Sequence, residues 1–419
     1  MIEELAKACV HCGFCLPTCP TYVLWSEEMD SPRGRIQLME KTAQGTLRLS
    51  PTVVEHFDRC LGCMACLSSC PSGVQYDRLI EATRSQVERR FARSRRDRAL
   101  RSLVFGLFPH PRRLRRLRPL LRAYQRLRLS FPLPSRVAAM QRLLPPLGPR
   151  VSVPSFTPAR GVRRARVGML LGCVQREFFG DVNAATVRVL TAEGCDVVAP
   201  AAQGCCGALS LHMGREDEAL SFAKRLIATF EPLSVDAVVV NAAGCGSAMK
   251  DYGWLLRDEP DWAARAAAFA AKVRDVSEWL VELGPVAPRH PVPLTVAYHD
   301  ACHLAHAQGV RSAPRELLAA IPEVELREIE EAAICCGSAG VYNIFQPEAA
   351  AELGARKAAN VAATGADVLV TANPGCLMQI RQALADRGTP MRLAHTVEIL
   401  DASLRAADGA GRSLRADRV

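Results

Sequence analysis

The chain has 419 residues, a formal net charge of +10 and 17 cysteines, and 49% of its residues are hydrophobic. This length suits two to four domains with a sizeable core, and cysteine is too sparse for a disulfide scaffold. Neither a signal peptide nor a predominantly apolar stretch of 18 residues is found, so we expect a cytoplasmic protein with reduced thiols.

Eight cysteines near the N-terminus form two copies of the run C-x2-C-x2-C-x3-C-P. They are Cys9, Cys12, Cys15 and Cys19, and then Cys60, Cys63, Cys66 and Cys70. Bacterial-type [4Fe–4S] clusters use this spacing, and in two-cluster ferredoxins the fourth cysteine ligates the other cluster. The first cluster is therefore assigned to Cys9, Cys12, Cys15 and Cys70, and the second to Cys60, Cys63, Cys66 and Cys19. Structural zinc, which usually uses two spaced pairs of ligands, leaves the doubled triplet unexplained.

The remainder of residues 1–91 favours helices. A turn at Ser31–Arg35 precedes a helical segment at Ile36–Glu40, and Tyr76–Phe91 places apolar residues at helical spacing. No strand alternation is found. We therefore expect a helical module with two clusters, called here the N-terminal module.

Residues 92–164, called the connector, carry an unusual charge pattern. From Arg98 to Arg176 there are 18 Arg and no Asp or Glu. Apolar side chains recur among these arginines at helical spacing, namely Leu114, Leu117, Leu120, Leu121, Tyr124 and Leu127. Pro119 is expected to kink or restart this helix.

The connector has four interpretations. It could lie on an anionic membrane surface, dock an acidic partner subunit, or be a solvated linker. Nucleic acid binding is the weakest, because no recognition motif accompanies the charge and aromatic residues make up only 5% of the chain.

From residue 165 the sequence repeats itself. Three anchors recur at offsets of 129, 130 and 131 residues: Cys173 and Cys302, Cys205 and Cys335, and Cys245 and Cys376. Each unit alternates apolar strands with amphipathic helices, so residues 165–285 and 290–405 are predicted to be two small parallel α/β units. We call them the first and second CCG repeats, after their Cys-Cys-Gly strings. The expected fold class is α+β and multidomain.

Each repeat places four cysteines in strand-end loops, where open α/β sheets bind ligands. They are Cys173, Cys205, Cys206 and Cys245, and then Cys302, Cys335, Cys336 and Cys376. These sets could hold further iron–sulfur clusters or zinc, or form redox-active pairs. Cys195 falls outside the pattern and is expected to be a core thiol.

Histidines near Cys302 allow a Cys/His zinc site. They are His299, His303 and His306. We favour the interpretation that they hydrogen-bond and orient the loop, and we interpret His212 and Asn343 in the same way.

The chain resembles the iron–sulfur subunits of bacterial glycolate oxidases, which belong to quinone-linked flavoprotein complexes. The matching strings are Cys9–Cys15, Asp30–Arg35, Leu171–Arg176, His299–Ala307, Cys335–Gly340 and Asn373–Cys376. In the broader superfamily the fullest motif ends C-x-x-C and gives five cysteines per repeat. Here Ala242 and Asn373 take the first of those positions, which leaves four.

The resemblance implies an electron-transfer subunit that works with FAD-binding subunits, which oxidise glycolate to glyoxylate, and passes electrons toward quinone. It implies a peripheral position on the inner face of the cytoplasmic membrane, and no nucleic acid partner is expected. The chain shows no dinucleotide-binding glycine fingerprint, so we expect it to be inactive alone. The alternatives are a subunit of a lactate or glycerol-3-phosphate dehydrogenase, a heterodisulfide-reductase-like thiol/disulfide protein, and a soluble redox adaptor.

Overall fold

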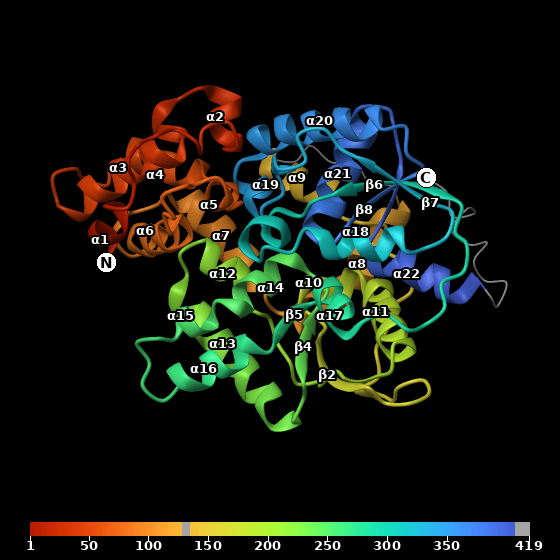
Figure 1. The fold of residues 1–419 in the computed structure, drawn as a ribbon. Helices are drawn as coiled ribbons and strands as arrows, with labels where there is room; N and C mark the ends of the chain where they lie inside the picture. Colours follow the sequence, from red (N-terminus) through yellow and green to blue (C-terminus); the bar gives the residue numbers. More distant parts are fainter. Residues whose placement is uncertain (128–134, 407–419) are drawn as a thin grey trace.

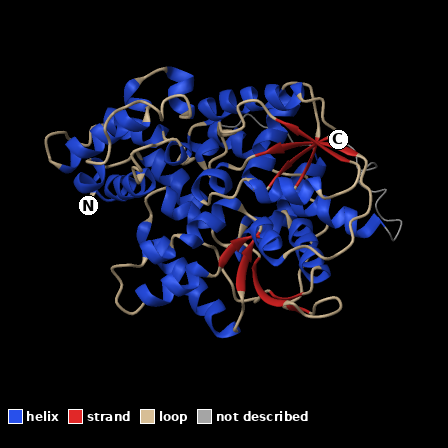
Figure 2. Ribbon diagram, in the orientation of Figure 1, coloured by secondary structure: helices blue, strands red, loops and turns tan. Residues whose placement is uncertain are grey.

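A computed structural model describes residues 1–127 and 135–406 (Figure 1). The N-terminal helices lie at one side of the molecule, and two α/β regions lie at the other. Figure 2 shows the strands as two separate groups, each surrounded by helices.

The N-terminal module is entirely helical, as the sequence predicted. Its elements are α1 (Ile2–Ala6), α2 (Pro20–Trp25), the 3-10 helix η1 (Glu28–Asp30), α3 (Pro32–Ala43), α4 (Pro51–Arg59), α5 (Ala65–Ser68) and α6 (Tyr76–Arg90). Ser31 and Ser50 start α3 and α4, because each hydroxyl accepts a hydrogen bond from a backbone N–H in the first turn and proline follows. Phe57, Leu79 and Ile80 are fully buried in the small core between these helices.

The connector forms α7 (Arg95–Leu107), α8 (Pro111–Leu127) and α9 (Ser135–Leu143). The helix does not restart at Pro119, because α8 continues through it. Contacts with the repeats hold this helix in place, since α8 packs on α10 (Val174–Phe178) of the first repeat. Among residues 1–127 and 135–406, no helix has both the length and the apolar character needed to cross a bilayer.

The two repeats contain parallel sheets of the same strand order. The strands of the first are β2 (Ala165–Leu170), β3 (Cys195–Val198), β4 (Ala237–Val240) and β5 (Val273–Asp275); those of the second are β6 (Leu294–His299), β7 (Val324–Glu328), β8 (Val368–Thr371) and β9 (Arg392–Ala394). The orders are β3-β2-β4-β5 and β7-β6-β8-β9, and β1 (Phe156–Thr157) adds an antiparallel edge strand to the first. The chain runs from β2 to β3 on one side of it and then crosses to β4 on the other side, and β6, β7 and β8 are connected in the same way. Each sheet therefore has a switch point of the kind at which open α/β sheets bind ligands.

Helices cover both sheets. Those of the first repeat are α10, α11 (Gly180–Ala192), α12 (Ala208–His212), α13 (Glu216–Phe230), η2 (Glu231–Leu233), α14 (Ala243–Lys250), α15 (Tyr252–Leu255), α16 (Ala263–Ala271) and α17 (Val276–Leu283). Those of the second are the π-helix η3 (His303–Ala307), α18 (Ser312–Ala319), α19 (Tyr342–Phe345), α20 (Pro347–Ala363), α21 (Pro374–Asp386) and α22 (Thr396–Arg405).

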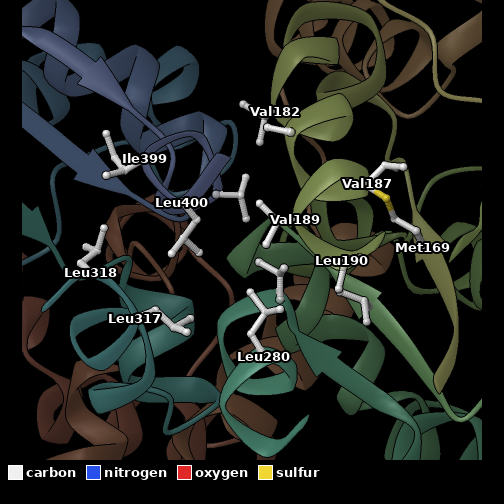
Figure 3. Packing of buried hydrophobic residues seen from close by; sticks show 14 of the residues in the cluster. Met169, Val182, Val187, Val189, Leu190, Leu280, Leu317, Leu318, Ile399 and Leu400 are labelled. Atoms are coloured by element: carbon white, nitrogen blue, oxygen red, sulfur yellow. The ribbon is translucent and has the colours of Figure 1, made fainter. Parts of the chain in front are cut away.

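The repeats pack on each other through equivalent helices. α11, the first long helix of the first repeat, contacts α22, the last helix of the second repeat. In the matching contact, α17, the last helix of the first repeat, packs on α18 of the second repeat. Leu190, Leu280, Leu317 and Leu400 extend into one shared core at this interface (Figure 3). Burying each such side chain contributes about 1.5–3 kcal/mol, so the two repeats form one stable unit.

Candidate metal centres

The cysteines of the first run lie in the loop between α1 and α2. Cys9, Cys12 and Cys15 line one cavity, and Cys70 and Cys66 from the second run line it as well. Cys12 is exposed, so this cavity lies at the surface. The fold thus brings both Cys70 and Cys66 to the cavity of the first run.

The second group of cysteines is buried. Burial, and then the charges of Cys63, Cys60 and Cys19, raise the pKa of the Cys66 thiol. Cys19 therefore lies near the cysteines of the second run, and Cys15 of the first run lies near Cys66 as well. The two groups adjoin, because Cys66 also lines the surface cavity.

Both loops have the same backbone conformation. The residues before and after the second cysteine have positive φ in each run: His11 (53°) and Gly13 (88°), then Gly62 (65°) and Met64 (63°). Non-glycine residues rarely adopt this conformation, so the matching φ angles indicate that both loops turn in the same way around their cysteines. In the second loop it directs the Gly62 N–H toward the sulfur of Cys60, at 3.4 Å.

A fully buried arginine stands beside the second group. Arg35 donates to the Thr21 hydroxyl at 3.0 Å and to the Asp30 carboxylate at 3.1 Å, and one nitrogen lies 4.0 Å from the Cys19 sulfur. Although burial acts in the opposite direction, the charges of Arg35 and Arg84 lower the pKa of the Cys60 thiol. A set of buried thiolates needs such compensation. In the sequence Arg35 stands in the predicted turn at Ser31–Arg35 and in a family string, and no pattern there predicts its place beside the cysteines.

The four cysteines of each repeat adopt equivalent arrangements. The sulfur of Cys205 lies 3.5 Å from that of Cys173, and the equivalent pair Cys302 and Cys335 is 3.9 Å apart. The remaining two thiols of each repeat also hydrogen-bond, namely Cys206 with Cys245, and Cys336 with Cys376. The carboxyl ends of parallel strands thus bring together cysteines that are about 70 residues apart in the sequence.

Each repeat contains at least one thiol whose pKa is strongly lowered. Hydrogen bonds from Cys205 and Cys245 hold the pKa of Cys206 well below its usual range, and Cys302 and Cys336 do the same for Cys335. The thiolate is the form that ligates metals and acts as a nucleophile, so both sets suit a metal centre or thiol chemistry.

His299 joins the second set. Its ligand atom and the sulfurs of Cys336 and Cys376 lie within 4.8 Å of one another. A hydrogen bond from Cys336 and then one from His299 lower the pKa of Cys376 to about 5. Asn373, at the position of the missing fifth cysteine, donates to the Cys376 sulfur at 3.4 Å.

The other polar candidates make hydrogen bonds or lie in the core. His306 is 2.8 Å from the Ser68 hydroxyl, and Asn343 donates to Gln379 at 3.0 Å. His303 lies 3.6 Å from the Cys302 sulfur, and His212 lies 3.3 Å from Glu81. Cys195 is fully buried in the shared hydrophobic core.

One cavity, of about 480 Å³, joins both cysteine sets to the connector. The cysteines that line it are Cys173, Cys205, Cys206, Cys245, Cys302, Cys335 and Cys376. Leu114, Leu117, Leu121 and Tyr124 of α8 line it too. This apolar face is expected from the sequence to lie against a membrane or a partner, but in the structure it faces the cysteines. Because residues from the connector and from several loops of both repeats build the cavity, no local pattern could have predicted it.

The second cysteine run packs directly on the second repeat. Cys63 and Leu61 share a buried cluster with Cys302 and Cys335. Arg84 links the module to the first repeat by donating to the His212 carbonyl at 2.8 Å. The cysteines therefore form a series from the exposed first run, through the buried second run, to the repeats.

Comparisons with known proteins agree with this organisation. Family models match a 4Fe-4S dicluster domain at residues 5–74, the linker region of a glycolate oxidase iron-sulfur subunit at 96–144, and a cysteine-rich domain at 167–250 and 296–381.

Curated relatives span nearly the whole chain. It is 40% identical to the probable glycolate oxidase iron-sulfur subunit of Bacillus subtilis over 94% of this chain and 92% of that one. It is 34% identical to the glycolate oxidase iron-sulfur subunit of Escherichia coli over 96% and 95%. A lactate utilization protein A of Exiguobacterium is 31% identical over 58% of this chain and 99% of that protein.

A solved structure shares the fold. A hypothetical protein from Helicobacter pylori aligns over 89% of this chain and 72% of that one, with a TM-score of 0.52 at 9% identity.

Proposed function

Because this chain belongs to the family of glycolate oxidase iron–sulfur subunits, we propose that it transfers electrons from FAD-binding partner subunits that oxidise glycolate to glyoxylate. The final acceptor is a quinone, and the chain is inactive on glycolate alone. The observation that carries this proposal is the series of cysteine sets, which runs from an exposed loop to an apolar cavity. Such a series suits a protein that receives electrons at one surface and delivers them elsewhere.

The N-terminal cysteines fit two [4Fe–4S] clusters. Each proposed set supplies four thiol sulfurs, and the second lies beside the positive charges of Arg35 and Arg84. When bound, the clusters supply sites that accept and release single electrons. The chain's own residues orient the thiolates, balance their charge and exclude water from the second set.

The repeats are proposed to hold iron in at least one of their two cysteine sets. The four thiols of each repeat match the donors of an iron–sulfur cluster, whereas zinc would also accept His299 beside Cys336 and Cys376. Iron and zinc analysis of the anaerobically purified full chain distinguishes these cases. Iron beyond the eight atoms of two [4Fe–4S] clusters supports the proposal, and zinc alone in the repeats contradicts it.

The connector is proposed to hold the complex on the anionic inner face of the cytoplasmic membrane. Arg112, Arg116 and Arg126 are exposed on α8, as are Leu120 and Leu127. Replacing Arg112 and Arg116 by Glu should release the protein from anionic vesicles, and added salt should weaken wild-type binding. Unchanged vesicle binding by the variant contradicts this placement.

The catalytic assignment is tested with the partner subunits present. The reconstituted complex should reduce a dye with glycolate as donor, and this chain alone should not. Deleting its gene should abolish growth on glycolate and leave growth on lactate largely intact. Because lactate utilization proteins are also similar to this chain, the opposite growth pattern would move the assignment to a lactate-oxidising complex.

A further inference from the structure

The cavity between the repeats has the size of a site for a small organic molecule. Its volume of about 480 Å³ falls within the usual range of such sites, and part of it is the space beside the seven cysteines of the sets proposed to hold iron. α8 packs on α10 of the first repeat, and α9 packs on α19 and α21 of the second, so the connector closes it. Val137 of α9 both lines the cavity and is partly exposed, which indicates where the cavity reaches the surface.

The connector side of the cavity is apolar. Its side chains include Leu114, Leu117, Leu121 and Met140. Among the described residues that line the cavity there is no Lys, Arg, Asp or Glu. An organic acid anion, such as the 2-hydroxy acid itself, would have no charge partner here.

Several buried polar groups at the cavity have no hydrogen-bond partner among the described residues. They are the Tyr124 hydroxyl, both polar atoms of the Gln175 amide, and the Nε2 atoms of His212 and His303. Gln175 is 3% exposed and His303 is 8% exposed. A buried polar group left unpaired costs about 1–3 kcal/mol, so these groups favour a ligand that forms hydrogen bonds.

The two histidines are arranged as a pair. Their ring centroids are 4.9 Å apart. The Nδ1 atom of His212 lies 3.3 Å from Glu81 and that of His303 lies 3.6 Å from the Cys302 sulfur. With both Nδ1 atoms engaged, both Nε2 atoms remain for a ligand.

We propose that this cavity binds the ring of a lipid-soluble quinone, the acceptor named in the proposed function on which this inference rests. A quinone is a flat apolar ring with two carbonyl oxygens that accept hydrogen bonds. The leucines of α8 contact the ring, and the Tyr124 hydroxyl donates to a quinone oxygen. Each Nε2 atom donates to a quinone oxygen or accepts from a hydroquinone O–H, according to the tautomer of its ring. Forming the hydroquinone takes two electrons and two protons, the number released when one 2-hydroxy acid becomes the 2-oxo acid.

Photolabelling locates the bound ring in the full, cluster-loaded chain. A photoreactive azidoquinone should label peptides of α8 and α9, and excess decylubiquinone should suppress the labelling. Decanoic acid should not suppress it, because it has a chain but no quinone ring. Labelling elsewhere, or equal suppression by decanoic acid, overturns the proposal.

Adjacent leucines provide a matched pair of variants. Leu121→Trp fills the cavity and should weaken decylubiquinone binding at least tenfold, whereas Leu120→Trp changes a side chain that is 68% exposed and should bind as wild type. If iron content shows that Leu121→Trp has misfolded, Tyr124→Phe replaces it, with an expected loss of about threefold to tenfold. Wild-type affinity in a folded cavity variant overturns the inference. Glycolate-dependent dye reduction by the wild-type complex tests the proposed function separately, because reduction of the dye does not require quinone to bind in this cavity.

Discussion

The N-terminal module and the repeats both gather cysteines, but by different means. In the module, three cysteines of each set come from one short loop whose backbone is shaped around them. In the repeats, each set is assembled from three strand-end loops that a parallel sheet brings together. The module has only a small hydrophobic core, whereas the repeats share a large one, so we expect the module's fold to depend more on bound metal.

Iron removal should separate the two regions most clearly. Anaerobic chelation should unfold residues 1–91, because structural metal sites in small domains contribute about 10 kcal/mol or more to folding. The sheets of both repeats should persist, because they rest on buried apolar side chains. Hydrogen exchange would show this as lost protection in α3, α4 and α6 with retained protection in β2 and β6. Uniform loss of protection would contradict the comparison.

Two cysteine substitutions test the order of the sets within the module. Cys12→Ser and Cys63→Ser should each remove roughly half of the cubane EPR signal, because each removes one ligand of one cluster. Cys63 also packs against Cys335, so its variant should additionally perturb the second repeat. Equal hydrogen exchange in the second repeat of both variants would argue against a direct contact.

The charge arrangement of the module predicts a smaller effect. Arg35→Met should lower the free energy of unfolding by about 3–5 kcal/mol, because it breaks a fully buried ion pair with Asp30. Arg33→Met is the matched control from the same string. Its ion pair with Glu28 is partly exposed, so the loss should be about 1 kcal/mol or less. Anaerobic guanidinium unfolding measures both, and equal losses would contradict the assigned role of Arg35.

Glu81 gives the smallest expected effect, at the boundary between module and repeats. Burial and then Asp77 raise its pKa to about 7, and burial lowers the pKa of the neighbouring His212 to about 4. The folded protein therefore binds the Glu81 proton more tightly than the unfolded chain does. The protonated carboxyl contributes its full stability below pH 4.5, and this contribution is lost as the pH rises through 7. Glu81→Gln should therefore gain stability relative to wild type between pH 5 and 8, by up to about 3 kcal/mol. A pH-independent difference would mean that Glu81 does not hold this proton.

The sequence predicted most of the fold where the signals are local or duplicated. The helical module, the two matched strand pairs β2 and β6, and β4 and β8, and the placement of cysteines after these strands follow from spacing and hydrophobic pattern. The sequence did not predict the strands β3 and β7. The residues that it missed act over long distances in the chain. Arg35 reaches Cys19 and the His56 carbonyl, 16 and 21 residues away, and α8 turns its leucines toward cysteines more than 50 residues away. Such contacts exist only after the elements have packed, so no spacing rule could reveal them.

The paired packing of α11 with α22 and of α17 with α18 has the form of an isologous dimer interface within a single chain. In a dimer of identical subunits, any substitution would change both halves alike. Covalent fusion removes that restriction. The last residue of β2 is Leu170, whereas the equivalent last residue of β6 is His299. Ala242 lies beside the cysteines of the first repeat, whereas Asn373, at the equivalent position of the second, donates to the Cys376 sulfur. Since hydrogen bonds to sulfur tune redox centres, breaking the symmetry allows one chain to hold two centres of unequal potential.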